Sequence, residues 1–282
     1  MSKIIINDVT LRDGLQNEPY FVDTDKKVAL ANLIIDSGIN YLEITSFVSP
    51  KAIPQLSDAF VLSTDDNLKD AYFSALVPNL KGFKKCLNTK IKEAVLFISA
   101  CEKHNYKNLG RSINETILKL EEIFTEGIDK NINFRAAISM VFGSPFIKSL
   151  PDKKDLYKII EFFLENNVSD ITLSDTWGSV DKETFERQLK SISDDFNFEN
   201  FSLHLHDIGG NACLNVEIAL DYGIRKFDTS FKGLGGCPFS PEKGGNLNIR
   251  DFFKVLDRKG YEINLDEYKL NEVEKFFDRI RS

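Results

Sequence analysis

The sequence predicts a single α/β domain over residues 1–282, folded as a (β/α)8 TIM barrel. Eight short runs rich in β-branched and aromatic residues recur along the chain, and longer amphipathic segments separate them. No proline-rich or low-complexity linker divides the sequence. Such alternation indicates a parallel sheet, and α/β barrels commonly have this length. An open doubly wound sheet is disfavoured because no GxGxxG motif follows the first strand.

The eight runs are the expected strands, and their carboxyl ends should meet at one mouth of the barrel, where active sites of this fold lie. They cover residues 3–11, 41–47, 71–77, 93–100, 133–141, 170–176, 201–207 and 226–231. Apolar residues with i, i+3, i+4 spacing predict helices between the strands, and the pattern is weakest in residues 55–66. Ser112 with Glu115, and Asp181, are expected at helix N-termini. An extra helix is expected over about 265–282.

Composition limits the partners of the protein. The net charge of −7 leaves no general basic surface, so no nucleic acid and no anionic lipid is expected as a ligand. The four cysteines form no C-x-x-C pair, as expected of free thiols in a reducing compartment. The first residues show neither a signal peptide nor a membrane span, so we expect a cytoplasmic protein without a membrane partner.

The stretch FSLHLHD holds two of the three histidines of the chain, His204 and His206. Side chains alternate along a strand, so both imidazoles should lie on one face, where a metal ion would hold them together. A pair at this spacing is also short enough to arise by chance. Asp207 could support a histidine N–H, although strand alternation points it the other way. The third histidine, His104, is expected in a loop outside the site.

Four polar residues at predicted strand ends could share one metal site. Asp13 follows the first strand, beside Arg12, although Asp-Gly is also a common surface turn. His204 and His206 belong to the seventh strand, and Asn246 closes the run after the eighth. Carboxylate, imidazole and amide ligands together suit a divalent cation, Mg²⁺ or Mn²⁺, and zinc remains possible.

Other polar residues are expected at or near the same mouth. Glu43 lies inside the second strand, and Arg135 on the fifth is a natural ion-pair partner for it, in either a structural or a catalytic pair. Asp175 and Thr176 end the sixth strand. The run FKGLGGCPFSPEKGGN follows the eighth strand and is either a flexible connection or a glycine-rich lid, at about 232–246, which would bring Cys237 over the mouth.

These motifs resemble those of the 3-hydroxy-3-methylglutaryl-CoA lyases, a metal-dependent family built on TIM barrels, over nearly the whole chain. TLRDGLQNE is similar to the first-strand signature of that family, and LHLHD is similar to its paired metal histidines. GLGGCPFSPEKGGN is similar to its cysteine-bearing lid. RDGLQNE and GLGGCP are specific motifs, whereas H-x-H and D-T-x-G also occur in related condensing enzymes.

The resemblance implies a reaction and a role for each matching residue. The reaction is retro-Claisen cleavage of 3-hydroxy-3-methylglutaryl-CoA, or a closely related branched 3-hydroxyacyl-CoA, to acetyl-CoA and acetoacetate or the matching 3-oxo acid. The implied ligands of the divalent cation are Asp13, His204, His206 and Asn246. The implied catalytic residues are Arg12, Asp13, Glu43, His204 and Cys237. Substrate contacts are expected from Arg12, Gln16, Arg135 and Thr176, with support from Asp175 and Asp207.

Departures from the family pattern concern the acyl group rather than the reaction type. Pro19 stands where the family has lysine, and Trp177 where it has a smaller aliphatic residue. Two alternatives stay open: a condensing enzyme that joins acetyl-CoA to a 2-oxo acid, and a non-catalytic barrel that binds metal or acyl-CoA. The resemblance also implies a homodimer.

Overall fold

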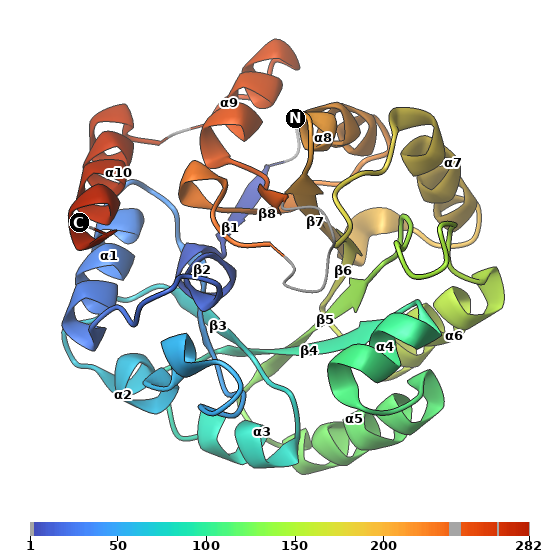
Figure 1. Ribbon diagram of the computed structural model, residues 1–282, viewed down its shortest axis with the longest axis horizontal. Coiled ribbons are helices and arrows are strands. Elements are labelled where there is room, and N and C mark those ends of the chain that lie inside the picture. Colours follow the sequence, from blue (N-terminus) through green and yellow to red (C-terminus); the bar gives the residue numbers. More distant parts are fainter. Residues whose placement is uncertain (1–2, 237–243, 264, 282) are drawn as a thin grey trace.

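The computed structural model describes residues 3–236, 244–263 and 265–281, and it confirms the predicted barrel. Each strand pairs in parallel with the next, and pairing of β8 with β1 closes the ring (Figure 1). The strands are β1 Ile5–Asp8, β2 Tyr41–Ser46, β3 Tyr72–Leu76, β4 Glu93–Ser99, β5 Asn133–Ser139, β6 Asp170–Asp175, β7 Phe201–Asp207 and β8 Lys226–Thr229. Because all eight run the same way, their carboxyl ends form one mouth.

The helices surround the strands as an outer layer (Figure 1). They are α1 Thr24–Asp36, α2 Ala59–Thr64, α3 Leu80–Cys86, α4 Glu102–Leu109, α5 Ile113–Gly127, α6 Lys153–Glu165, α7 Lys182–Ser193, α8 Asn211–Asp221, α9 Ile249–Arg258 and α10 Glu267–Arg281. The extra C-terminal helix is α10, which packs beside α1 and buries Leu270, Val273 and Phe277. None of the helices in the described part of the chain has the length and apolar character that crossing a membrane requires.

Local sequence signals set several helix boundaries. Ser112 and Glu115 form a complete capping box at the start of α5, as predicted. Asp181 accepts the backbone N–H of Thr184 at the start of α7, also as predicted. The weak pattern in residues 55–66 yields only the short helix α2, which follows a 3-10 turn.

A ninth strand, β9, consists of Gly245 and Asn246 and pairs antiparallel with β7. Both residues belong to the predicted lid, of which 237–243 lie outside the described residues. Here the chain passes so close to itself that a Cβ on Gly245 would lie 1.9 Å from the carbonyl oxygen of Gly233. Glycine is therefore required for β9 to reach β7.

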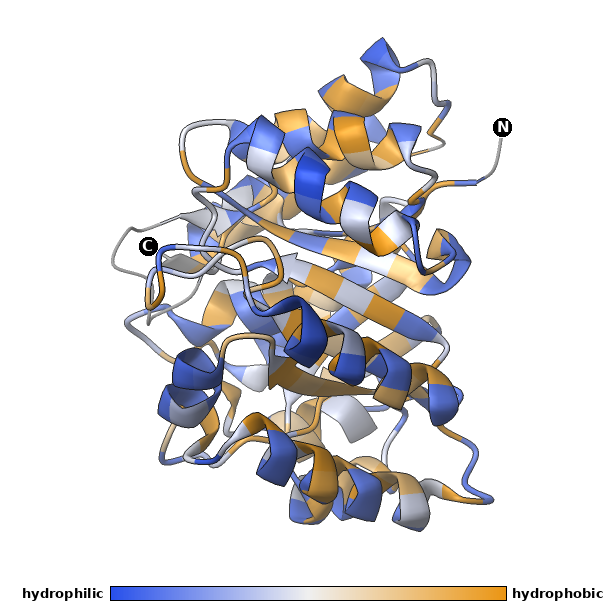
Figure 2. Ribbon diagram, turned by 90° about the vertical axis from the view of Figure 1, so that its right-hand side faces the viewer, coloured by the Kyte–Doolittle hydropathy of each residue, from blue (hydrophilic) through white to orange (hydrophobic). Residues whose placement is uncertain are grey.

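The core lies between the barrel and the helices, which carry apolar and polar residues on different faces (Figure 2). A buried polar contact joins α1 to the segment before α2. The Lys27 ammonium on α1 is 2.7 Å from the Asp58 carboxylate, which precedes α2, and 2.6 Å from the carbonyl oxygen of Gln55. Because the Lys27 side chain is only 1% exposed, its charge depends on these two partners.

We expect Lys27→Met to lower the free energy of unfolding by about 3 kcal/mol, because it leaves the Asp58 charge buried without its cation. The neighbouring Lys26 pairs with Asp23 in an ion pair of which both side chains are at least half exposed. Lys26→Met is therefore the matched control and should cost less than about 1 kcal/mol. Urea denaturation of both variants measures the difference, and equal losses would contradict the buried-pair assignment.

Candidate active site

A π-helical turn, Thr10–Gly14, directly follows β1 and carries Arg12 and Asp13. Asp8, the last residue of β1, holds the turn by accepting both the backbone N–H of Thr10, at 3.0 Å, and its hydroxyl, at 2.9 Å. Burial raises the pKa of Asp8 to about 7 despite these bonds. Turns of this kind are frequent at functional sites, and here the turn directs both Arg12 and Asp13 into the mouth.

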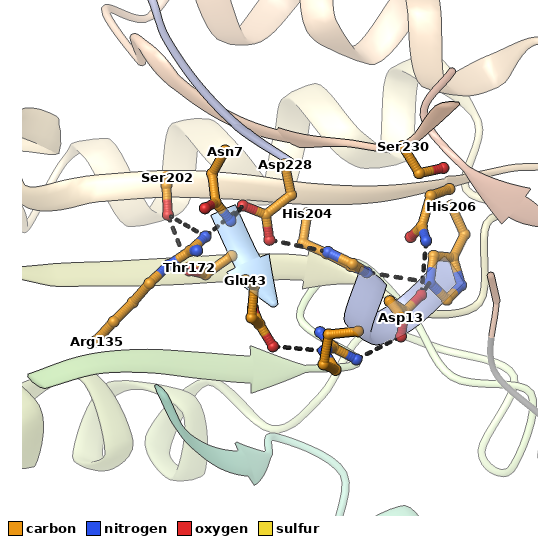
Figure 3. A network of polar contacts seen from close by, with 12 residues as sticks. Asn7, Asp13, Glu43, Arg135, Thr172, Ser202, His204, His206, Asp228 and Ser230 are labelled. Atoms are coloured by element: carbon orange, nitrogen blue, oxygen red, sulfur yellow. Dashed lines mark hydrogen bonds and ion pairs between the residues drawn. The ribbon is translucent and has the colours of Figure 1, made fainter. Parts of the chain in front are cut away.

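Arg12 bridges two buried carboxylates, Glu43 and Asp13, which are labelled in Figure 3. Its Nε contacts Glu43, and its Nη1 contacts Oδ1 of Asp13. Glu43 is 1% exposed, so Arg12 neutralises a charge that could not otherwise stay in the barrel. The expectation that Arg135 would pair with Glu43 is wrong, because Arg135 instead contacts Asp228, on a strand across the barrel.

His204 and His206 lie on one face of β7, as the alternation predicted, with their Nε2 atoms 3.1 Å apart. The Nδ1 of His206 lies 3.1 Å from the carbonyl oxygen of Thr176, and the Nδ1 of His204 lies 3.0 Å from Oδ2 of Asp228. Both partners accept hydrogen bonds, so each Nδ1 carries the proton and each Nε2 directs its lone pair at the other. Such lone pairs repel unless a proton or a metal cation lies between them.

Asn246 joins the histidines because the antiparallel register pairs it directly with His206. Its side-chain amide donates to Oδ2 of Asp13 and to the carbonyl of Leu234, both at 2.6 Å. Among the described residues, its Oδ1 is buried without a hydrogen-bond partner. A buried oxygen left in this state costs about 1–3 kcal/mol, so its position indicates a ligand.

Asp13 completes the donor set as a carboxylate. Burial acts to raise the pKa of Asp13, but the Arg12 guanidinium and the two imidazoles outweigh burial and hold the pKa below its ordinary value. Burial lowers the pKa of His206 to about 4, so His206 is neutral at pH 7. Ligand atoms of Asp13, His204 and His206 lie within 4.8 Å of one another. With the unpaired oxygen of Asn246, the set fits a divalent cation.

Asp228, on β8, is the part of the site that the sequence analysis missed. It is paired with His204 in the register of β7 and β8 and holds its ring. The signal was present, because an acidic residue inside an apolar strand is seldom buried without a partner. Glu43, inside the second strand, gives the same sequence signal as Asp228.

The remaining predicted residues divide into those near the donor set and those apart from it. Gln16 donates to Oδ1 of Asp13 at 2.7 Å. Asp175 accepts the backbone N–H of Gly178 at 2.9 Å, and thereby shapes the turn that brings the Thr176 carbonyl to His206. The hydroxyl of Thr176 accepts the backbone N–H of Met140 at 3.3 Å.

Four other residues considered in the sequence have a different outcome. Asp207 does not support a histidine but accepts the backbone N–H of Ala212, at the start of α8. Arg135 lies deeper in the barrel and is not brought to the donor set. Cys237 lies outside the described residues. His104, expected in a loop, lies buried on α4, with its Nδ1 2.9 Å from the hydroxyl of Ser99.

A buried set of carboxylate, imidazole and amide donors at the carboxyl end of a TIM barrel defines the class of the protein, an α/β barrel with the features of a metal-dependent enzyme. Over residues 3–277 the sequence matches the family described as HMGL-like. The chain belongs to this family, which confirms the resemblance found in the sequence.

Related proteins share almost the full length of the chain. Hydroxymethylglutaryl-CoA lyase YngG of Bacillus subtilis is 37% identical over 277 residues, which cover 98% of this chain and 92% of YngG. The mitochondrial hydroxymethylglutaryl-CoA lyase of Homo sapiens is 32% identical over 97% of this chain and 84% of its own.

Solved structures agree with this assignment. The crystal structure of the B. subtilis HMG-CoA lyase has a TM-score of 0.93 at 36% identity and covers 99% of this chain and 94% of its own. An HMG-CoA lyase from Acinetobacter baumannii, in complex with coenzyme A and 3-methylmalate, has a TM-score of 0.91 at 31% identity, with coverages of 99% and 91%.

We expect Gly235→Ala to disturb the donor set while the barrel stays folded. Gly235 has a φ of 103°, and an added Cβ would lie 2.3 Å from Nδ2 of Asn246 and 2.5 Å from Oδ2 of Asp13. Binding of Mn²⁺, measured by isothermal titration, should weaken about tenfold or more. Gly110→Ala is the control, since Gly110 also has a positive φ but an added Cβ meets no atom within 4 Å. Equal Mn²⁺ affinity in both variants would refute the expected clash.

Proposed function

We propose that this chain is a divalent-metal-dependent carbon–carbon lyase that cleaves 3-hydroxy-3-methylglutaryl-CoA to acetyl-CoA and acetoacetate. The observation that carries the proposal is the buried donor set of Asp13, His204, His206 and Asn246 in a chain of the HMGL-like family. Facing imidazole nitrogens, a buried carboxylate and the amide oxygen of Asn246 together suit a metal-assisted reaction.

The proposed reaction is a retro-Claisen cleavage. A divalent cation held by the donor set would supply Lewis-acid stabilisation of the negative charge that develops on the C3 oxygen. The C3 hydroxyl gives its proton to Asp13, because His204, the other candidate base, carries its proton on Nδ1 and directs Nε2 at the cation site. The C2–C3 bond then breaks, its electron pair stays with C2 as the thioester enolate of acetyl-CoA, and C3 becomes the ketone carbon of acetoacetate.

Arg12 is proposed to face the thioester carbonyl and stabilise the enolate. The guanidinium already lies between the carboxylates of Glu43 and Asp13, so it is held in place before substrate binds. A cation fixed in this way needs no reorganisation as charge develops, which is where electrostatic stabilisation is most effective. Glu43 thus acts through Arg12.

The other proposed roles follow from the family motifs. Cys237 would give its thiol proton to C2 of the enolate and complete acetyl-CoA. Gln16 and Thr176 would contact the substrate, in keeping with their positions beside Asp13 and His206. Asp175 would support them by shaping the turn that follows β6.

The finer assignments belong to the same proposal. The acyl-CoA substrate is supported by the coenzyme A bound to the A. baumannii relative. The ion is proposed to be Mg²⁺ or Mn²⁺, because oxygen donors accompany the two imidazoles. Leucine breakdown is the proposed pathway, a homodimer the proposed assembly, and the cytoplasm the proposed compartment, the last in keeping with the bacterial relative YngG.

Cys237→Ala should leave Mn²⁺ affinity and thermal stability unchanged but lower kcat by about 10²-fold or more, because positioned proton transfer contributes rate of this order. Cys213→Ala is the control: Cys213 is half-buried on α8, and burial raises the pKa of its thiol to about 11. Steady-state kinetics at saturating metal measures both variants. Turnover of Cys237→Ala equal to that of the wild type would remove the thiol from the mechanism.

The test of the function is mass-spectrometric product analysis of metal-stripped protein incubated with 3-hydroxy-3-methylglutaryl-CoA, with and without Mg²⁺ or Mn²⁺. We expect acetyl-CoA and acetoacetate only when metal is added. Condensation of acetyl-CoA with a 2-oxo acid, without cleavage, would instead establish a condensing enzyme. Binding of the thioester without any product would establish a non-catalytic barrel.

A further inference from the structure

A polar network continues from the candidate metal site toward the opposite, amino end of the barrel (Figure 3). It begins at His204, passes to Asp228 on β8 and reaches Arg135 on β5. Both Asp228 and Arg135 line a cavity of about 290 Å³ that is bounded mainly by the first residues of the strands. The network therefore reaches the site from the amino end of the barrel, opposite the mouth.

The two carboxylate oxygens of Asp228 have different partners, and Oδ2 is the oxygen that contacts His204. Its Oδ1 accepts from Nη2 of Arg135 at 2.5 Å and from the side-chain amide of Asn7 at 2.9 Å. Its Oδ2 lies 3.0 Å from Nδ1 of His204. With an Arg ion pair on one oxygen, Asp228 is an ionised acceptor, so the proton of this contact lies on the histidine.

Arg135 is itself fixed in orientation. Its Nε donates to Oγ1 of Thr172 at 2.7 Å, and its Nη2 is 3.4 Å from Oγ of Ser202. Asp170 lies 3.7 Å from Nε, and Arg135 is only 3% exposed. The planar guanidinium cannot turn without losing these contacts, so it determines which oxygen of Asp228 remains for His204.

We propose that Asp228, held by Arg135, is a positioning residue that keeps His204 in the Nδ1–H tautomer and so directs its Nε2 lone pair into the candidate metal site. The inference rests on the proposed function in that a cation is taken to occupy the site. It gives Arg135 a positioning role in place of the substrate contact expected from the sequence.

The two histidines differ in a way that makes the proposal testable. His206 is held by the backbone carbonyl of Thr176, which no side-chain substitution removes. His204 is held by a side chain, so its tautomer alone should respond to a change at Asp228. The chain contains only one further histidine, His104, so a histidine-specific spectrum holds three rings.

Asp228→Asn is the decisive variant because it preserves shape and changes one donor. Arg135 and Asn7 both donate toward Oδ1 of Asp228, so the amide oxygen of the variant will face them. Its NH₂ group then faces Nδ1 of His204 and donates to it. The ring must therefore carry its proton on Nε2, where it points into the candidate metal site.

The first measurement is the histidine tautomer by long-range ¹H–¹⁵N correlation in metal-free protein, at about pH 8, where an unperturbed imidazole is neutral. In wild type we expect His204 and His206 both as Nδ1–H. In Asp228→Asn we expect His204 as Nε2–H, with His206 unchanged. A wild-type spectrum with His204 as Nε2–H would overturn the proposal without any variant.

The second measurement is Mn²⁺ affinity by isothermal titration. Asp228→Asn should weaken binding about 10–100-fold, the usual range for a residue that orients a metal ligand. Arg135→Lys keeps the positive charge but loses the planar set of N–H donors. It should weaken Mn²⁺ binding less than Asp228→Asn does. Ser169→Ala is the matched control, because Ser169 lines the same cavity but its hydroxyl donates to the backbone carbonyl of Phe134, and it should leave Mn²⁺ binding unchanged.

The two measurements separate this inference from the proposed function. If wild-type protein binds no Mn²⁺ and cleaves no thioester, the function fails, while the tautomer spectrum still decides whether Asp228 sets the proton position. If wild type binds Mn²⁺ but Asp228→Asn keeps the Nδ1–H tautomer and the wild-type affinity, the positioning role fails and the function stands.

Discussion

The short approach of two imidazole Nε2 atoms, 3.1 Å apart, is the constraint around which the rest of the site is built. Lone pairs at this separation repel each other, and a cation between them would remove the repulsion. The fold maintains the contact by tying down each opposite nitrogen, one to a backbone carbonyl and one to Asp228. Closure of the barrel then brings Asp13 from the turn after β1 and Asn246 from β9 to the same point.

Buried charge is distributed in two layers along the barrel axis. Near the mouth, Arg12 lies between Glu43 and Asp13; deeper, Arg135 pairs with Asp228. Burying ions costs desolvation, and apolar residues of similar size often stabilise a core as well or better. Both layers converge on the donor set, one through Asp13 and the other through Asp228, so these buried charges fit a role in positioning the donor set better than a role in stability.

Local periodicity in the sequence predicts which side chains share a face and which lie at the mouth. It does not predict which side chains contact one another across the barrel. Alternation along β7 predicted that both histidines share a face, and the loading of polar residues at strand ends predicted the mouth. Which residues meet across the interior depends on strand register and barrel closure, which no local pattern encodes. Hence Arg135 was assigned to Glu43, Asp228 was overlooked, and the two-residue strand β9 was hidden in a glycine-rich run.

In the proposed function, metal binding and substrate choice depend on different parts of the chain. The donor set is fixed by strands and by contacts from the amino end of the barrel, which the substrate does not reach in the proposed reaction. Trp177, by contrast, lies in the loop after β6, where its ring is in contact range of a Cβ placed on Gly143 in the loop after β5. A change in such a loop can reshape the acyl pocket while the lone pairs, and with them the reaction, stay in place.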